Sequence, residues 1–273
     1  MNIGVAGQLD PETREAFASL VENESVLVFE ENVTPLKTLA TPDNRYDNWY
    51  YPVPAGAGIR VHMSGNTYYG CTAGFSVKEN GGHQVKYILT AGHCLDGRTG
   101  NSVVIGSMLV EMGKAGIEYD HDYSSADVGL INLSDQESTS SWILDSALYY
   151  GNKLVSADQL NDVEGLAVCA SLGKSNAVKC GTVTNTNKNV TLSDDYGNTT
   201  YFVKQREVSI VTVKGDSGSP VFAGCSGCGK YVAAYGLLVG GGTTRSIVSY
   251  IGNIHSLLGT TTIKDDADPI YIY

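Results

Sequence analysis

The sequence predicts an all-β protein made of two antiparallel β-barrels of about six strands each, followed by a C-terminal helix. Composition is the first reason, because 32 glycines and 17 tyrosines with only 17% charged residues favour short strands joined by tight turns. The second is that short alternating apolar and polar segments fall into two runs, with a connector near residues 140–165 between them. The third is an amphipathic helix pattern at 249–258, ended by Gly259, which closes the second run.

An N-terminal arm over residues 1–56 precedes the first barrel in our division of the chain. Asp10 followed by Pro11 is a typical helix start, and apolar residues share one side of the following turns, so we predict a helix through Glu22. Four prolines between residues 29 and 56 favour an extended, turn-rich connector after this helix.

The predicted first barrel spans residues 57–155, the second spans 156–259, and a polar, acidic tail follows at 260–273. Residues 59–63 alternate, and the sequence Asn80-Gly81-Gly82 marks a turn before an apolar strand at 85–90. Further strands are predicted at 103–110, 128–133, 166–170, 180–192, 200–213, 220–223 and 231–239.

Charge and hydropathy exclude several classes of function. The net charge of −11 argues against nucleic acid as a partner and leaves no basic face for an anionic membrane. The chain has no run of 18 apolar residues, so we expect no membrane span. Its N-terminus lacks a basic stretch followed by an apolar one, so we expect a signal peptide to have been removed or left out.

Three short motifs carry the chemistry: Thr90-Ala91-Gly92-His93-Cys94, Ala126-Asp127-Val128-Gly129-Leu130-Ile131 and Gly215-Asp216-Ser217-Gly218-Ser219-Pro220. A serine hydroxyl is a poor nucleophile near neutral pH and needs a base to take its proton. An imidazole can take that proton and return it to a leaving group, and a carboxylate behind the imidazole fixes its tautomer. These motifs therefore predict a catalytic triad of His93, Asp127 and Ser217.

The order of the three residues along the chain narrows the fold. An α/β-hydrolase runs Ser, Asp, His and needs Gly-x-Ser-x-Gly, whereas Ser219 stands at the place of the second glycine. The subtilisin order begins with Asp and also fails. His, Asp, Ser is the order of the chymotrypsin-like proteases. The chain resembles this family from roughly Gly70 to Gly259, and most closely its secreted bacterial branch, the streptogrisins and α-lytic protease.

Besides the motifs around His93 and Ser217, the resemblance rests on Cys71–Phe75, Val168–Val183 and Gly236–Gly241. It implies a trypsin-like fold and a secreted serine endopeptidase that works through an acyl-enzyme. Ser217 would be the nucleophile, His93 the general base and acid, and Asp127 the orienting carboxylate. The resemblance further implies an oxyanion hole formed by the N–H groups of Gly215 and Ser217.

Proteins or peptides would be the substrates of such an enzyme, and it would need no cofactor and no metal ion. We expect it to be a monomer. The arm at residues 1–56 would be a remnant of the pro-region that precedes the protease in the resembled family, or an added segment.

Other residues compete for the catalytic roles. Asp120 and Asp122 are alternatives to Asp127, but their neighbours His121 and Tyr123 predict that both are exposed to solvent. The remaining histidines lack a recognisable frame or are expected to be structural or surface residues: His62, His83, His121 and His255.

The six cysteines form three local pairs on spacing alone: Cys71 with Cys94, Cys169 with Cys180, and Cys225 with Cys228. The first two pairs recur at matching places in the resembled family. An even count suggests an oxidising, extracellular setting. Reduced thiols, or a metal site at Cys225 and Cys228, are the alternatives, although a lone Cys-x-x-Cys is a weak zinc motif.

Asp216, beside the nucleophile, matches a buried ion-pair partner that shapes the oxyanion loop in the resembled family. In the bacterial branch an arginine just after the first cysteine of the second disulfide pairs with it, whereas this chain has Ala170 there. Lys174 or a processed N-terminus could take the place of that arginine. We hypothesise that the chain is a zymogen and that proteolysis between Asn48 and Gly58 precedes full activity.

By family register, the base of the primary specificity pocket lies at Val211 and Thr212, and its wall at Val239, Gly240 and Gly241. No aspartate stands at the base, so we predict cleavage after apolar residues. Lys214 could attract an acidic side chain of the substrate, although a solvated lysine at the rim is the more common situation. Val239 also replaces a family serine whose hydroxyl supports the triad aspartate.

Two other functions are open to this scaffold. A catalytically silent homologue would use the fold as a binding module, and an esterase would use the same catalytic residues on a non-peptide substrate. The presence of all three triad residues favours the enzyme over the binding module.

Overall fold

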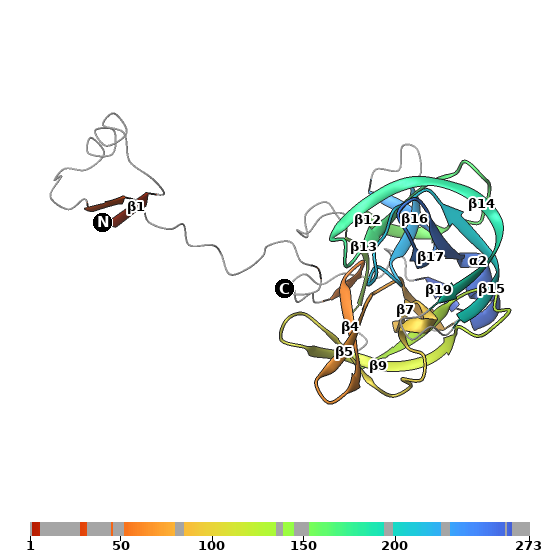
Figure 1. Ribbon diagram of the computed structural model, residues 1–273, viewed down its shortest axis with the longest axis horizontal. Helices are drawn as coiled ribbons and strands as arrows, with labels where there is room; N and C mark the ends of the chain where they lie inside the picture. Colours follow the sequence, from red (N-terminus) through yellow and green to blue (C-terminus); the bar gives the residue numbers. More distant parts are fainter. Residues whose placement is uncertain are drawn as a thin grey trace. The chain divides into compact units, whose positions relative to one another are not determined.

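The computed structural model of the protein describes residues 2–5, 28–31, 45, 52–79, 85–134, 139–144, 153–193, 199–224, 230–259 and 261–263 (Figure 1). The chain divides into two compact units, Met1–Pro42 and Asp43–Tyr273. In the first unit, strand β1 (Asn2–Val5) pairs in parallel with strand β2 (Val28–Glu31). The helix predicted from Asp10 through Glu22 lies outside the described residues.

The first sheet of the second unit has eight strands in the order β19-β6-β7-β10-β9-β8-β4-β5. Its neighbouring strands all pair in antiparallel fashion. The strands are β4 (Gly58–Ser64), β5 (Thr67–Thr72), β6 (Ser76–Glu79), β7 (Val85–Thr90), β8 (Ser102–Ile105), β9 (Val110–Tyr119), β10 (Val128–Leu133) and β19 (Thr261–Ile263). The start of the C-terminal tail thus contributes a strand beside β6.

The single strand predicted at 103–110 is wrong in its extent. The chain turns at residues 106–109, where Gly106 and Leu109 have positive φ angles of 73° and 53°, so that β8 ends before the turn and β9 begins after it. Hydropathy alternation also misses β5, because the three residues from Tyr68 to Gly70 are all half-buried instead of alternating between the two faces.

The second sheet has nine strands in the order β16-β13-β14-β15-β18-β17-β12-β11-β3. An additional pairing between β16 and β17 closes the first six of these strands into a ring, which is a six-stranded barrel. The strands are β3 (Val53–Ala55), β11 (Thr139–Ile143), β12 (Lys153–Asp158), β13 (Ala167–Leu172), β14 (Ala177–Ser193), β15 (Thr199–Val208), β16 (Pro220–Gly224), β17 (Tyr231–Gly241) and β18 (Ser246–Tyr250).

Strands β11 and β12 lie in the region expected to be a connector. They extend the second sheet beyond the barrel, where β12 pairs in parallel with β17 and β11 pairs in parallel with β3. Helix α2 (Ile251–Leu258) ends at Gly259, which has the positive φ angle of 75° that favours glycine at a helix end. The predicted helix start at Ser249 is too early, because Ser249 and Tyr250 pair with β17 as part of β18.

Two clusters of buried apolar side chains fill the protein. One belongs to the first sheet and includes Ile59, Ile88 and Ile131. The larger cluster joins Tyr235 of the second sheet to Leu89 of the first, so this core crosses the seam between the sheets. Burying each large apolar side chain contributes about 1.5–3 kcal/mol, so packing across the seam holds the end of β7 against the second barrel. The all-β, two-barrel prediction is therefore confirmed.

Two disulfides, Cys71–Cys94 and Cys169–Cys180, join the cysteines that were expected to pair. Cys225 and Cys228 lie outside the described residues. In the described part of the chain, no helix is long and apolar enough to cross a membrane.

Candidate active site

His93 lies in a short 3-10 helix, Gly92–Cys94, that directly follows β7. Asp127 directly precedes β10, and the antiparallel pairing of β7 with β10 brings the two residues together. The His93 Nδ1 atom donates a hydrogen bond of 2.6 Å to Asp127 Oδ2, and the backbone N–H of His93 donates one of 2.9 Å to Oδ1. The Asp127 side chain is fully buried, whereas 32% of the His93 side chain is exposed. The imidazole therefore has a fixed tautomer and one accessible edge.

Opposing effects set the pKa of His93. Burial lowers it, but the negative charge of Asp127 and its hydrogen bond raise it, and the net pKa lies above the usual 6.5. The negative charge of Asp120 also raises the pKa of His93. Asp120 itself is half-buried, not exposed as expected. Burial, followed by repulsion from Asp127, raises the pKa of Asp120 to about 6.

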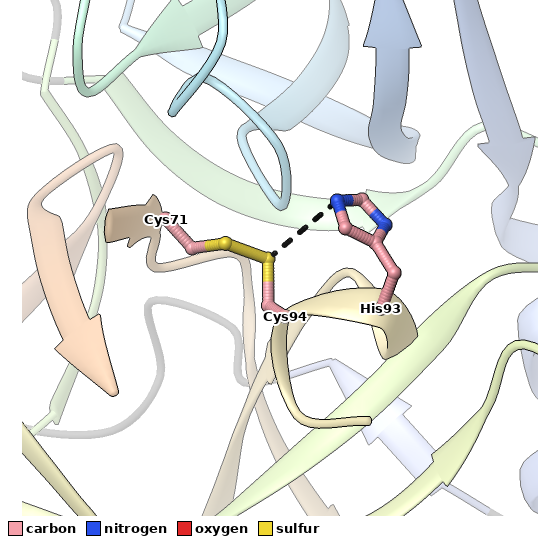
Figure 2. Close-up of side chains that lie close together, drawn as sticks. All are labelled: Cys71, His93 and Cys94. Atoms are coloured by element: carbon pink, nitrogen blue, oxygen red, sulfur yellow. Dashed lines mark hydrogen bonds between the residues drawn. A yellow bond between two sulfur atoms is a disulfide. The ribbon is translucent and has the colours of Figure 1, made fainter. Parts of the chain in front are cut away.

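The loop of His93 is closely packed and covalently braced. A Cβ atom at Gly92 would lie 2.8 Å from Asp127 Oδ1, so only glycine fits between the loop and the carboxylate. The disulfide Cys71–Cys94 joins the loop to β5, and His93 Nε2 lies 4.0 Å from Cys94 Sγ (Figure 2). Two sulfurs and an imidazole are zinc ligands in other settings, but a disulfide has no thiolate to offer. We therefore interpret this cluster as a structural cross-link that holds the loop of His93, and not as a metal site.

Ser217 lies in the turn before β16. Its hydroxyl donates a hydrogen bond of 3.0 Å to the Val239 carbonyl, and the Thr72 N–H donates one of 2.8 Å to the Ser217 carbonyl. The next residue, Gly218, is so close to the first sheet that a Cβ there would lie 3.0 Å from Ala91 N. The turn of Ser217 thus packs against the loop of His93. The Ser217 hydroxyl, however, donates its hydrogen bond to the Val239 carbonyl and not to His93.

Thr72 holds two of the peptide groups around the nucleophile. Besides its N–H bond to Ser217, its Oγ1 hydroxyl donates a hydrogen bond of 2.9 Å to the Gly215 carbonyl. Gly215 has a φ angle of 96°, a conformation open mainly to glycine. Sequence reasoning gave Thr72 no role, and the available signal was a hydroxyl residue directly after Cys71.

Asp216 is fully buried, and its carboxylate accepts three hydrogen bonds. Ser175 donates two of them, from its N–H at 2.8 Å to Oδ1 and from its hydroxyl at 2.6 Å to Oδ2. The Val213 N–H donates the third, at 2.9 Å to Oδ2. The lysine considered as a partner, Lys174, is exposed, and it is the next residue, Ser175, that contacts Asp216.

A buried polar network holds the backbone of Asp127 from behind. The Asp127 N–H donates to Ser249 Oγ at 2.8 Å, and the Ser249 hydroxyl donates to Gln205 Oε1 at 3.0 Å. Both Ser249 and Gln205 are fully buried. At Val239, where the resembled family has a serine that supports the aspartate, this chain has no hydroxyl, and Ser249 supports the aspartate backbone instead. Polar residues in strands are too common for the sequence to single these two out.

Among the residues assigned to the specificity pocket, Val239 contacts the nucleophile, and Thr212 and Gly241 lie beside each other. The Val239 carbonyl contacts Ser217, and a Cβ at Gly241 would lie 2.4 Å from Thr212 Oγ1 and 2.2 Å from Ser246 Oγ. These two hydroxyl oxygens are 2.9 Å apart, and Ser246 donates its proton to the Ile210 carbonyl at 2.6 Å. Thr212 must therefore donate to Ser246, so both hydroxyl protons are used within the protein.

The remaining pocket candidates differ in burial. Val239 is almost fully buried at 1% exposure, whereas Val211 is 39% exposed. Lys214 and Gly241 are exposed, and Gly240 is half-buried.

The competing histidines that the structure describes, and Asp122, have contacts outside the His93–Asp127 pair. His62 contacts the Gly65 carbonyl, His121 is exposed and contacts the Asp122 carbonyl, and His255 pairs with Asp158 at 2.9 Å. Asp122 is exposed and accepts the Tyr201 N–H. His83 lies outside the described residues.

Comparison with known proteins identifies the family. The family model described as Trypsin matches residues 53–252, which is more than half of the chain. None of the curated proteins matches the chain significantly.

Among solved structures, Thermobifida fusca protease A is 23% identical with a TM-score of 0.57, and 78% of this chain covers 99% of that one. Cellulomonas bogoriensis chymotrypsin is 20% identical with a TM-score of 0.57, over 78% of this chain and 98% of that one. A glutamic acid specific serine protease, described as using a histidine triad in substrate binding, is 25% identical with a TM-score of 0.57, over 78% and 100%. The trypsin-like fold is thus confirmed, and the chain belongs to the trypsin family as a serine endopeptidase.

Proposed function

We propose that this endopeptidase cleaves peptide bonds with a triad of Ser217, His93 and Asp127. The observation that carries the proposal is the 2.6 Å hydrogen bond between His93 Nδ1 and the buried Asp127 carboxylate. With Nδ1 occupied as a donor, Nε2 is the nitrogen that can accept a proton. The proposal requires the Ser217 hydroxyl, which donates to the Val239 carbonyl in the structure, to donate to Nε2 instead when substrate is bound.

In the proposed reaction, Ser217 Oγ attacks the scissile carbonyl while His93 Nε2 takes its proton. The imidazolium then gives this proton to the leaving amine, and the Asp127 carboxylate stabilises the imidazolium without taking the proton. A water molecule, deprotonated by His93, hydrolyses the acyl-enzyme and restores Ser217. No step requires a cofactor or metal ion, so treatment with a chelator should leave turnover unchanged.

The N–H groups of Gly215 and Ser217 are proposed to stabilise the oxyanion of the tetrahedral intermediate. The support is that Thr72 binds the carbonyl of each of these two residues, which restrains the peptide group that directly follows each donor N–H. Each donor of this kind typically contributes about 3–4 kcal/mol to the stability of the transition state.

For the residue before the cleaved bond, we propose an apolar side chain. Support comes from the buried Val239 and from the two hydroxyls beside Gly241, whose protons are already donated within the protein. A carboxylate entering there would find no hydroxyl proton to accept, and burying it unpaired is costly. An acidic side chain is the competitor, because Lys214 is exposed nearby in sequence and one structural neighbour is glutamic acid specific.

We further propose that the protein works outside the cytosol, because disulfides such as Cys71–Cys94 and Cys169–Cys180 form and persist in oxidising compartments. Alkylation of the protein recovered from the culture medium of its source, without prior reduction, would leave these four cysteines unmodified. Alkylated cysteines at these positions would contradict the proposal.

The decisive test is a serine-directed organophosphonate followed by mass spectrometry. We expect an adduct on Ser217 that disappears in Ser217→Ala. A natively folded protein that takes up no label would point to a binding module.

Turnover of matched amide and ester substrates separates the endopeptidase from an esterase, which would cleave only the ester. Peptides that differ only by Leu, Phe or Glu before the cleaved bond test the pocket, and a preference for Glu would contradict the apolar assignment.

A further inference from the structure

The carboxylate of Asp216 is the buried charge closest in sequence to the proposed nucleophile. It is fully buried and lies between Gly215 and Ser217, the two residues proposed to donate to the oxyanion. A buried carboxylate is tolerated only when hydrogen bonds or a cation replace its lost hydration. The groups that bind the Asp216 carboxylate therefore also determine the shape of the loop that carries the two proposed oxyanion donors.

Ser175 supplies most of this compensation. Its N–H and its hydroxyl bind different oxygens of Asp216, at 2.8 Å and 2.6 Å, so the carboxylate is held at both ends. The remaining donor is the N–H of Val213, which belongs to the loop itself. Among the described residues, Ser175 is thus the contact that anchors the Asp216 carboxylate to a different part of the chain.

The turn that carries Ser175 is itself well anchored. It joins β13 to β14, and the disulfide Cys169–Cys180 links these two strands close to the turn. On one side of it, a Cβ at Gly173 would lie 2.4 Å from Thr72 Oγ1, the same atom that binds the Gly215 carbonyl. The turn therefore packs against the residue that holds the opposite side of the oxyanion loop.

Arg45 reinforces the turn from the other side. Its guanidinium is fully buried and donates to Ser171 Oγ at 2.7 Å and to the carbonyl of Leu172 at 3.3 Å. Its backbone N–H donates at 3.2 Å to the side-chain oxygen of Asn176, which adopts a positive φ of 54° just after Ser175. These three contacts of Arg45 thus hold residues on both sides of Ser175.

We propose that Ser175 is a positioning residue that orders the oxyanion loop through Asp216, with Arg45 bracing the turn. The proposal rests on the function proposed above. In this arrangement one hydroxyl and two backbone N–H groups replace a cation beside Asp216, so a new N-terminal ammonium group is not required there. Cleavage between Asn48 and Gly58 would instead separate Arg45 from the strands that follow it.

The test compares Ser175→Ala, which keeps the backbone N–H and loses the hydroxyl, with Ser175→Thr, which keeps both donors. Ser156→Ala, an exposed serine on β12, is the matched control. We expect Ser175→Ala to lower kcat by about 10- to 100-fold with little change in KM, because the buried carboxylate loses a charge-assisted hydrogen bond. Ser175→Thr should recover most of the rate, and the control should match the wild type.

Hydrogen exchange of the amides at 213–219 provides a readout that does not depend on catalysis. We expect faster exchange in Ser175→Ala, and slower organophosphonate labelling of Ser217 in the same variant. If the wild type is labelled and Ser175→Ala is labelled equally fast with unchanged exchange, the positioning role is refuted. If no variant is labelled, the proposed function fails, and exchange alone decides whether Ser175 orders the loop.

A second experiment addresses the N-terminus. The intact 273-residue chain is expected to react with the phosphonate before any cleavage, and Arg45→Met should slow this reaction. Reaction that begins only after cleavage near residues 48–58 would overturn the claim that no new N-terminus is needed.

Discussion

The loop of His93 and the loop of Ser217 meet at the seam between the two sheets, but different interactions hold them. The His93 loop is tied by a disulfide between residues only 23 positions apart and by a carboxylate 34 positions away. The Ser217 loop has hydrogen bonds to Val239, to Ser175 through Asp216, and to Thr72, the last of which lies 143 positions from Gly215.

The two loops therefore contribute in different ways to the proposed reaction. The His93 loop carries the imidazole of the proposed proton-transfer pair, and the disulfide that holds it comes from nearby residues of the same sheet. The Ser217 loop needs an accurate backbone geometry, and hydrogen bonds from distant residues supply it. We therefore expect changes at the first loop to act on proton transfer and its pH dependence, and changes at the second to act on the stabilisation of the transition state.

Removing the charge of Asp127 beside the His93 loop should produce the largest loss of kcat. Asp127→Asn keeps the shape of the side chain but lets His93 take the wrong tautomer, so kcat should fall by about 10⁴-fold. Steady-state kinetics measures the loss, and thermal unfolding checks that the variant is folded. A variant that keeps a tenth or more of the wild-type kcat would contradict the proposed role of Asp127.

Removing one hydrogen bond from the Ser217 loop should lower kcat by less. Thr72→Val is close to isosteric and removes the hydroxyl that donates to the buried Gly215 carbonyl, so kcat should fall by about 10- to 100-fold. Thr72→Ser keeps the hydroxyl and serves as the control. Equal losses in the valine and serine variants would show that packing of the methyl group, and not the hydrogen bond, is what matters.

The same contrast explains what could be predicted from the sequence. His93, Asp127 and Ser217 stand in short motifs, because each needs particular neighbours such as Gly92, whose missing side chain leaves room for the carboxylate. The two barrels could be predicted because alternating strands and glycine-rich turns are local patterns. The disulfide partners were close in sequence, and the structure joins them.

The supporting residues could not be predicted, since each depends on a contact between distant strands. Ser175 and Ser249 are ordinary polar residues until the fold places them against Asp216 and the backbone of Asp127. The strands β11 and β12 were also missed. They pair with each other, and their other partners, β3 and β17, come from distant parts of the chain. A contact with a distant residue leaves no local pattern in the sequence.

The pH dependence sharpens the comparison at the level of proton transfer. His93 must be neutral to act as a base, and its raised pKa means that the base form is lost earlier as the pH falls. The acid limb of kcat/KM should therefore have its midpoint above 6.5. Asp120→Asn removes a negative charge that raises this pKa, so its acid limb should move to lower pH, whereas Thr72→Val should leave the midpoint unchanged. A shift in Thr72→Val would mean that the two loops are electrostatically coupled.

The smallest expected effect concerns the stability of the His93 loop. Because burial and its acidic neighbours raise the pKa of Asp120 from 3.8 to about 6, folding favours the protonated carboxyl, and the ionised form destabilises the protein. Stability should thus fall as the pH rises from about 4 through about 6, and Asp120→Asn should be more stable than the wild type above that range by about 1 kcal/mol. This is less than the pKa shift alone would give, because solvent screens a partly buried carboxylate. Denaturant unfolding at pH 8 and pH 4 measures the difference, which should vanish at pH 4. An equal gain at both pH values would place its origin in packing and not in charge.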